Sequence, residues 1–338
     1  MSDLRWGVIG LGFFGEKHAE ALAGIPGIEL HSLCTRRPER LAEVAGRLDV
    51  GRTFTDYREM LADPELDAVS ITTHWREHAE PALAAMAAGK HVFCEKPMAS
   101  TVEECRAMVA AARRGPGRFM VGHICRFNPR YALARREIAE GKIGRVVSMY
   151  SRRNIPAARS AVTLGKVGPI IGDGVHDVDL MMWLSGARPV SVYARGVFER
   201  GLPNPDVAWS MFEFDNGAIG VLEDGWFLNG PGAVRIDERM EIIGTEGSVH
   251  IQEVAPSLLV VDRDGPSFPD TTYWPQVRGV TAGALRDELR YFADCILTGD
   301  EPKVITPEES MAAAVACLAA EESVRTGKVV TLQELDGG

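Results

Sequence analysis

The chain has 338 residues, which is enough for two domains of ordinary size. Hydrophobic residues make up 46% and charged residues 25%, and 47 Asp plus Glu against 37 Lys plus Arg give a formal net charge of -10. This is the composition of a folded globular protein, and its acidic balance argues against nucleic acid or an anionic membrane as a partner. No apolar run approaches the roughly 18 residues of a membrane helix, and residues 6–11 are too few for a signal peptide. We therefore expect a cytoplasmic protein whose six scattered cysteines are buried thiols.

The first third of the chain alternates short β-branched runs with helical patterns, which is typical of βαβ units. Strands are expected at residues 6–9, 29–34, 68–72, 91–94 and 119–122, and helices at residues 16–23, 38–48, 77–88 and 102–114. One helix fills each gap, so the pattern predicts a doubly wound parallel sheet over residues 1–123.

The pattern changes in the second part of the chain, residues 124–338. Helices are expected at residues 129–140, 177–184, 285–297 and 307–326, and strands at 146–153, 190–198, 207–214, 218–223, 239–243 and 248–251. Successive strands joined by short turns predict an α/β domain with a mostly antiparallel sheet.

A GxGxxG motif, formed by Gly10, Gly12 and Gly15, follows the first expected strand and opens the first helix. In such a motif the first glycine permits a tight turn, the second admits a pyrophosphate, and the third lets the helix pack closely. We therefore expect a dinucleotide here, in contact also with Phe13 and Phe14. The alternative is a glycine-rich structural turn.

The second expected strand ends at Thr35, Arg36 and Arg37, with no acidic residue to bind the ribose 2′-hydroxyl of NAD. A hydroxyl and two guanidinium groups suit a 2′-phosphate, so NADP is expected to be preferred over NAD. Alternatively, the two arginines are solvated residues at a helix start and either dinucleotide binds.

Glu95, Lys96 and Pro97 stand at the carboxyl end of a parallel strand, where open α/β sheets bind ligands. A lysine held beside a nicotinamide cofactor can give a proton to a carbonyl oxygen during hydride transfer, or stabilise the alkoxide in the reverse direction. The alternative is an ordinary surface lysine in a turn.

The chain resembles the Gfo/Idh/MocA (glucose-fructose oxidoreductase/inositol dehydrogenase) family over nearly its whole length. The matching segments are GLGFFG, HAEPALAAMAAGKHVFCEKPMA, VGHICRFNPRY, GVHDVDLMMWLSG and IIGTEGSVHI. The resemblance implies a Rossmann domain followed by an α/β domain whose large sheet often serves in oligomerisation, hence a homodimer or homotetramer. It also implies reversible oxidation of a sugar or cyclitol hydroxyl, with Lys96 in the catalytic site and Pro97 after a cis peptide bond.

In the segment GDGVHDVDL the resemblance places the family's catalytic histidine at His176. Relatives carry an aspartate four residues earlier, where this chain has Gly172. Asp173 is only three residues before the histidine, so it takes that place only if the preceding loop is re-routed. Asp179 matches the family's aspartate three residues after the histidine. Without the resemblance, His176 would be interpreted as a histidine that binds a backbone group near a helix start.

His74 to His78 literally fit H-x-x-E-H, a zinc-hydrolase pattern. That pattern needs both histidines on one helix and a further ligand, whereas His74 almost directly follows a strand, so no metal is expected. By resemblance the segment lies beside the cofactor, through Thr73, His74, Trp75 and His78.

Positive charge gathers in the second part of the chain, at Arg126, Arg152, Arg153, Arg159 and Lys166. The RFNP string is similar to the subgroup that oxidises C3 of UDP-N-acetylhexosamines, and arginines that fork onto a diphosphate would explain it. The expected substrate contacts are Arg126, Asn128, Arg153 and Asp177. The alternative is solvated charge on a strand.

The sequence therefore predicts an NAD(P)-dependent oxidoreductase that acts on a sugar, nucleotide-sugar or cyclitol hydroxyl. Two other functions stay open: a glycosidase that uses bound NAD for transient oxidation, and a non-catalytic dinucleotide-binding regulatory protein.

Overall fold

The computed structural model describes residues 3–157, 164–228, 236–253, 258–263 and 265–332. It divides into two compact units, each made of two stretches of chain: Met1–Asn128 with Thr272–Met311, and Pro129–Thr271 with Ala312–Gly338. The sequence predicted a single boundary at residue 123, whereas the N-terminal unit runs to Asn128 and also includes the later segment Thr272–Met311.

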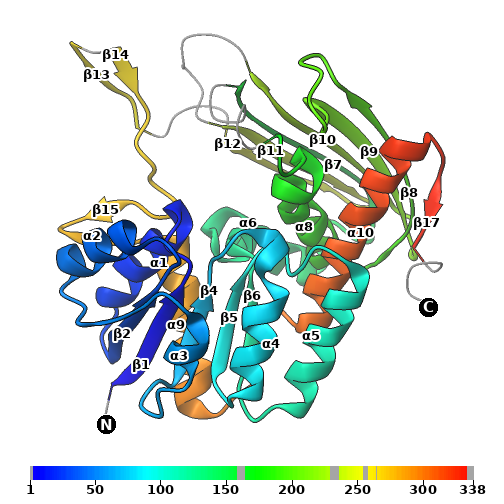
Figure 1. The fold of residues 1–338 in the computed structure, drawn as a ribbon. Helices are drawn as coiled ribbons and strands as arrows, with labels where there is room; N and C mark the ends of the chain where they lie inside the picture. The colour runs from blue at the N-terminus through cyan, green and yellow to red at the C-terminus, as the bar shows by residue number, and fades with distance from the viewer. Residues whose placement is uncertain (1–2, 158–163, 229–235, 254–257, 264, 333–338) are drawn as a thin grey trace. The chain divides into compact units, whose positions relative to one another are not determined.

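The N-terminal unit is built on a six-stranded parallel sheet in the order β3-β2-β1-β4-β5-β6 (Figure 1). Its strands are β1 (Leu4–Ile9), β2 (Ile28–Cys34), β3 (Arg52–Phe54), β4 (Ala68–Ile71), β5 (His91–Glu95) and β6 (Phe119–Gly122). Its helices are α1 (Phe13–Ala23), α2 (Pro38–Leu48), α3 (Tyr57–Leu61), η1 (Trp75–Glu77), α4 (Ala79–Ala87), α5 (Val102–Arg114), η2 (Ile124–Phe127) and α9 (Ala284–Thr298). The doubly wound sheet expected from the sequence is confirmed.

The core of this unit joins residues that are far apart in the sequence. The Phe292 ring of α9 packs edge-on against Trp6 of β1 and Phe93 of β5, with ring centroids 5.7 and 5.9 Å apart. All three side chains are fully buried. Helix α9 therefore completes a core that the first 123 residues leave open.

The second unit is built on a seven-stranded mixed sheet in the order β12-β11-β7-β10-β9-β8-β17, in which only β7 and β10 pair in parallel among the described pairings. Its strands are β7 (Val146–Pro156), β8 (Pro189–Val197), β9 (Val207–Phe214), β10 (Ile219–Leu228), β11 (Asp237–Gly244), β12 (Ser248–Glu253) and β17 (Val330–Thr331). Its helices are α6 (Pro129–Ala139), the π-helical turn η3 (Ile170–Gly174), α8 (Val175–Ser185) and most of α10 (Pro307–Thr326). The mostly antiparallel sheet is confirmed.

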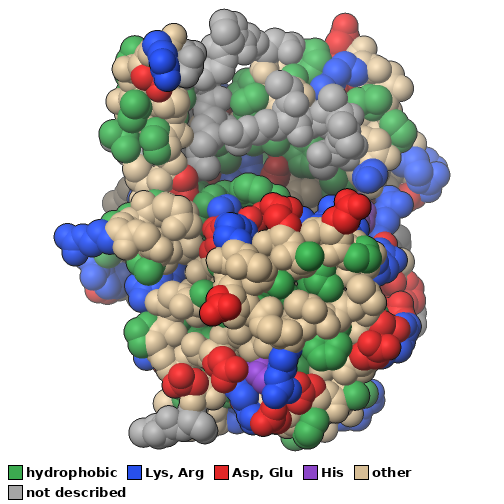
Figure 2. Space-filling model, turned by 60° about the vertical axis from the view of Figure 1, so that its left-hand side comes forward, with side chains coloured by type: hydrophobic (Ala, Val, Ile, Leu, Met, Phe, Trp, Pro, Cys, Tyr) green, Lys and Arg blue, Asp and Glu red, His purple; other side chains and the backbone are tan. Residues whose placement is uncertain are grey.

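The described residues also contain two short hairpins that the sequence did not predict. They are β13 (Val260–Asp262) with β14 (Gly265–Ser267), and β15 (Gln276–Val277) with β16 (Val280–Thr281). All six cysteines are buried free thiols, as expected. Among the described helices, none is both long and apolar enough to cross a membrane. Lys and Arg side chains are interspersed with Asp and Glu on the face drawn in Figure 2.

Candidate functional site

The glycine motif has the geometry of a phosphate-binding turn. Gly10 has a φ of +100°, and a β-carbon there would lie 2.7 Å from the backbone of Thr72. A β-carbon at Gly15 would lie 1.8 Å from the Gly10 carbonyl oxygen, whereas a β-carbon at Gly12 would meet no atom within 4 Å. The first and third glycines are therefore required by the fold, and the second leaves open space. Helix α1 begins at Phe13 without a side-chain cap, so its first N–H groups can bind a dinucleotide phosphate.

Aromatic side chains flank this turn. Phe13 is 65% exposed, and Phe14 packs on the ring of His18, with centroids 5.4 Å apart. Trp274, from the segment that returns to this unit, lies edge-on to both phenylalanines, at 6.2 and 5.3 Å between centroids. No pattern in the sequence indicated Trp274, because the stretch Pro129–Thr271 of the second unit separates it from the glycine motif.

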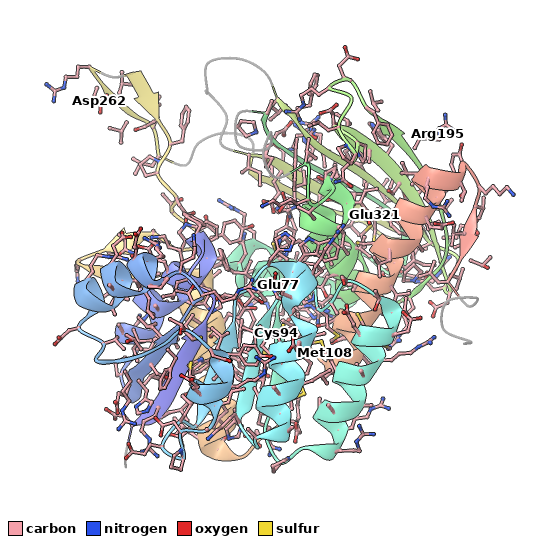
Figure 3. All side chains as sticks on the ribbon, viewed as in Figure 1. Glu77, Cys94, Met108, Arg195, Asp262 and Glu321 are labelled. Carbon is pink, nitrogen blue, oxygen red and sulfur yellow. The ribbon has the colours of Figure 1, made fainter. Side chains whose placement is uncertain are left out.

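The end of β2 brings the three residues of the expected NADP contact together. Thr35 is buried and donates its backbone N–H to the Phe54 carbonyl. Arg36 is 80% exposed in its side chain and forms an ion pair of 2.6 Å with Glu77, which lies before α4 (Figure 3). Arg37 donates to the carbonyl oxygen of Leu11, inside the glycine motif, at 2.7 Å. Both arginines have protein partners, and their contact with a 2′-phosphate stays a prediction.

The two histidines of the H-x-x-E-H string bind different backbone groups. His74 caps η1 by accepting the Arg76 N–H at 3.4 Å. His78 is buried, and its ring nitrogens lie 2.9 Å from the Pro97 carbonyl oxygen and 3.2 Å from that of Thr73. Burial lowers the pKa of His78 despite these carbonyls, so the ring is neutral and donates to one of them. His78 therefore links the Thr73 loop to the Pro97 turn.

Lys96 follows β5 in a turn that the protein holds from several sides. The Lys96–Pro97 peptide bond is cis, as the family resemblance implied. Glu95 is 7% exposed; its Oε1 lies 3.0 Å from His18 Nε2, and its Oε2 accepts the Lys96 backbone N–H at 3.2 Å. The Lys96 side chain is half-buried. The carboxylate thus binds within the protein and helps to shape the turn that carries the lysine.

His176 is the second residue of α8 in the other unit and is 7% exposed. The segment before it forms a π-helical turn, and the Asp173 carboxylate accepts the Trp226 indole N–H at 2.8 Å. A β-carbon at Gly172 would lie 2.9 Å from two ring carbons of Trp226. The Trp226 ring therefore takes the space that a side chain at residue 172 would need. Asp179 is fully buried.

Two of the expected substrate contacts, Arg153 and Asp177, form a buried ion pair of 2.5 Å. Arg153 also binds Glu238 at 3.1 Å, and the Tyr131 hydroxyl donates to the same carboxylate at 2.6 Å. Ser151 donates to Asp177. Burial raises the pKa of Asp177, although the Arg153 guanidinium opposes the shift. These contacts hold β7, β11, α6 and α8 together, and a contact with substrate stays a prediction for both residues.

The other expected substrate contacts, Arg126 and Asn128, lie in the N-terminal unit. Arg126 is 2% exposed and donates to the Val304 carbonyl at 2.6 Å and to Glu309 at 3.2 Å. Asn128 donates to the Tyr273 hydroxyl at 3.3 Å. Both anchor the returning segment. Of the remaining cluster, Arg152 pairs with Asp237, and Arg159 lies outside the described residues.

Two protein-family models match this chain. Residues 4–123 match the model of an oxidoreductase family with an NAD-binding Rossmann fold, and residues 131–250 match the GFO/IDH/MocA C-terminal domain. The chain belongs to the Gfo/Idh/MocA oxidoreductase family. The resemblance inferred from the sequence motifs is thereby confirmed, and this Gfo/Idh/MocA protein is an NAD-binding oxidoreductase.

Relatives of this Gfo/Idh/MocA protein match it over almost the whole chain. It is 32% identical to scyllo-inositol 2-dehydrogenase (NAD(+)) of Bacillus subtilis, over 98% of this chain and 96% of that one. It is 28% identical to myo-inositol 2-dehydrogenase of Thermotoga maritima, over 99% and 100%. Among solved structures, scyllo-inositol dehydrogenase of Lactobacillus casei with bound NAD(H) and scyllo-inositol has a TM-score of 0.85 at 24% identity, covering 98% and 99%. The last likeness establishes the fold.

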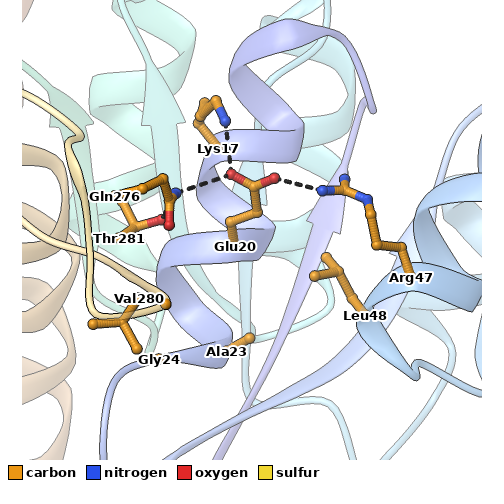
Figure 4. Close-up of a pocket in the computed structure, with 10 residues that line it drawn as sticks. Lys17, Glu20, Ala23, Gly24, Arg47, Leu48, Gln276, Val280 and Thr281 are labelled. Carbon is orange, nitrogen blue, oxygen red and sulfur yellow. Dashed lines mark hydrogen bonds and ion pairs between the residues drawn. The ribbon is translucent and has the colours of Figure 1, made fainter. Parts of the chain in front are cut away.

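A separate hollow of about 420 Å³ lies in the N-terminal unit of this family member, between α1, the end of α2 and the β15–β16 hairpin (Figure 4). Glu20 stands at its centre, bound by Lys17 and Arg47 at 2.7 Å each and by Gln276 at 3.5 Å. Because a carboxylate of the protein already occupies these donors, the hollow has no unsatisfied cationic group to offer an anion.

Proposed function

We propose that this protein is a dehydrogenase of a cyclitol or sugar, and that it oxidises a secondary hydroxyl with Lys96 and His176 as its proton-transfer groups. The observation that carries the proposal is the presence, in one parallel sheet, of an open turn at Gly12 after β1 and a lysine held at the carboxyl end of β5 by the buried Glu95. Relatives named as inositol 2-dehydrogenases support the substrate class.

When bound, the nicotinamide ring takes up or releases the hydride. Lys96, as an ammonium group, stabilises the alkoxide that develops on the substrate oxygen, and His176 accepts the hydroxyl proton. Their positions support these roles, since Lys96 directly follows the parallel strand β5, at the end where such sheets bind ligands, and His176 lies in the first turn of α8. Neither residue alone supplies both charge stabilisation and a neutral base.

We further propose that Asp173 supplies the acidic group that relatives place at residue 172. The Trp226 indole N–H holds its carboxylate in one orientation, which a solvent-exposed aspartate would lack. In this proposal the Asp173 carboxylate orients the His176 ring or stabilises its protonated form, as a carboxylate does for a catalytic imidazole. Asp179 remains the other candidate, although it is fully buried.

For the cofactor we propose a preference for NADP over NAD. The end of β2 carries the hydroxyl of Thr35 and the guanidinium groups of Arg36 and Arg37, and no carboxylate of residues 34–37 would repel a 2′-phosphate. Arg36 is exposed enough to turn from Glu77 to a ligand. A KM for NAD below that for NADP would contradict this preference.

For the substrate we propose a neutral cyclitol or sugar rather than a nucleotide-linked one. A diphosphate needs guanidinium groups that are available to it, whereas Arg126 and Arg153 are buried and bound to protein carboxylates. A thermal-shift screen of inositols, aldoses and nucleotide sugars in the presence of each dinucleotide tests this choice.

The decisive experiment follows absorbance at 340 nm with inositols and aldoses as substrates. Net formation of reduced cofactor, lost in both Lys96→Ala and His176→Ala while cofactor affinity is retained, is the expected result. Turnover of a glycoside without net reduction would indicate transient oxidation instead. Cofactor binding without any turnover would indicate a regulatory protein.

We also propose that the outer face of the second sheet forms the contact of a homodimer or homotetramer. On this face β9 exposes Trp209 and Met211, at 48% and 45%, and β10 exposes Ile219 at 45%. Apolar side chains in a row on a sheet surface favour association. Light scattering should find more than one subunit, and Trp209→Glu should reduce the mass to that of one chain.

A further inference from the structure

The buried side chains around Glu95 form a chain of hydrogen bonds that the proposed proton transfer does not use. It begins at Trp6, whose indole N–H donates to Ser70 Oγ at 3.0 Å, and continues from Ser70 to His18 Nδ1 at 3.2 Å. His18 Nε2 lies 3.0 Å from Glu95 Oε1, and Glu95 Oε2 accepts the backbone N–H of Lys96. Trp6, Ser70 and His18 have no exposed surface. The chain therefore connects β1, β4, α1 and the lysine turn out of reach of water.

The proton positions follow from the two ends of the chain. An indole nitrogen can only donate, so Ser70 Oγ accepts from Trp6 and keeps one lone pair and its own hydrogen for His18 Nδ1. The carboxylate of Glu95 selects between these: neutral His18 carries its proton on Nε2 and donates to Glu95, so Nδ1 accepts from Ser70. The other neutral tautomer would direct the Nε2 lone pair at a carboxylate oxygen 3.0 Å away, which is unfavourable.

Packing leaves these groups little freedom. The His18 ring lies between Phe14 and Phe93, with both centroid distances 5.4 Å. A β-carbon at Gly122 would lie 2.7 Å from Glu95 Oε1. The carboxylate thus uses the space that a side chain on the adjacent strand β6 would take. A fully packed hydrogen-bond chain holds its last member in one orientation.

We propose that His18 is a positioning residue for Lys96, acting through Glu95. His18 belongs to α1, whose first turn is the proposed phosphate site, and Glu95 binds the backbone of Lys96 itself. The contact therefore fixes the lysine turn to the helix that holds the dinucleotide. This inference rests on the proposed catalytic role of Lys96. A misplacement of about 1 Å can cost up to about 100-fold in rate, so a fixed turn has a kinetic effect.

A matched pair of variants tests the proposal. In His18→Gln the amide nitrogen reaches the place of Nε2 and still donates to Glu95, whereas the shorter side chain of His18→Asn can reach Ser70 but not Glu95. We expect His18→Gln to keep kcat within about threefold, and His18→Asn to lose at least about tenfold, with the dinucleotide KM nearly unchanged in both. Wild-type kcat in His18→Asn would overturn the proposal.

A second measurement separates positioning from a general effect on the fold. In a Lys96→Ala background, where a slow residual rate is followed at high enzyme concentration, His18→Asn should cause no further loss, because the group that it positions is gone. The same loss in both backgrounds would assign the effect to the fold and overturn the inference alone. Wild-type activity in Lys96→Ala would overturn the proposed function as well. If His18→Asn does not fold, Glu95→Gln, which replaces one acceptor oxygen by a donor, is measured in the same two backgrounds with the same expectations.

Discussion

The Trp226 indole donates to the Asp173 carboxylate at 2.8 Å, and the same ring leaves no room for a side chain at residue 172. One tryptophan thus excludes a side chain from residue 172, where the family resemblance led us to expect an acid, and binds the acid at residue 173. The hydrogen bond and the close approach therefore couple residues 172, 173 and 226 to one another.

Gly172→Asp should destabilise the protein. Its side chain would overlap the Trp226 ring, and overpacking of this kind typically costs about 1–3 kcal/mol. In a Trp226→Phe background the cost should be smaller, because phenylalanine lacks the two ring carbons that come too close. Urea unfolding of the four proteins measures the coupling, and equal costs in both backgrounds would contradict the prediction.

Asp173→Asn should lower kcat by about 10- to 100-fold at little cost in stability. The amide oxygen can still accept the Trp226 N–H, so the change removes the charge and keeps the contact. Steady-state kinetics and a thermal melt report the two effects separately. Trp226→Phe is the matched control, since it keeps the charge and loses the contact. Full activity of Asp173→Asn would contradict the prediction and show that His176 does not need the Asp173 carboxylate.

Arg36→Ala should reduce kcat/KM for NADP by about 10- to 100-fold and leave that for NAD nearly unchanged, because a hydrogen bond to a charged group contributes about 1.5–3 kcal/mol. Glu77→Gln should instead raise kcat/KM for NADP, since it releases the Arg36 guanidinium from its ion pair. Arg58→Ala is the control: Arg58 is also exposed and paired with a glutamate, Glu80. Equal losses with both dinucleotides in Arg36→Ala would contradict the prediction.

Asp63 should make unfolding depend on pH between about 4 and 2. Burial alone would raise the pKa of Asp63, but the Glu65 backbone N–H, His31 and Arg52 together lower it to about 2. The pKa is lower in the folded protein, so the stabilisation is present above the unfolded value of 3.8 and is lost as the pH falls towards 2. We expect about 1 kcal/mol after screening, because Arg52 is half exposed. Denaturant unfolding at pH 5 and pH 2.5 should show a smaller difference in Asp63→Asn than in the wild type.

The local elements were predictable from the sequence wherever one chain segment determines the chemistry. Strands β1, β2, β4, β5 and β6 follow from buried β-branched runs, and the glycine spacing at Gly10 and Gly15 follows from close packing that the structure confirms. The strand of Arg52–Phe54 and the hairpin of Gln276–Val277 with Val280–Thr281 were missed, since two or three residues carry no measurable period.

Side-chain partners were less predictable, because they depend on long-range packing. The sequence showed that basic residues gather around Arg153. It did not indicate that Asp177 and Glu238, which belong to other elements, would form ion pairs with Arg153. His18 carries no motif signal beyond its place in α1. The close approach of Trp226 to residue 172 could have been suspected only if Gly172 had been interpreted as a position with no room for a side chain.

The position of Phe292 limits where this protein can be cut into fragments that fold. Phe292 lies in α9, which follows the long first stretch of the second unit, Pro129–Thr271, yet it closes the aromatic core at Trp6 and Phe93. A fragment ending at residue 123 would therefore expose two large rings to solvent and be prone to aggregate. An exchange of this unit between relatives would have to transfer two separate gene segments, one for residues 1–128 and one for residues 272–311.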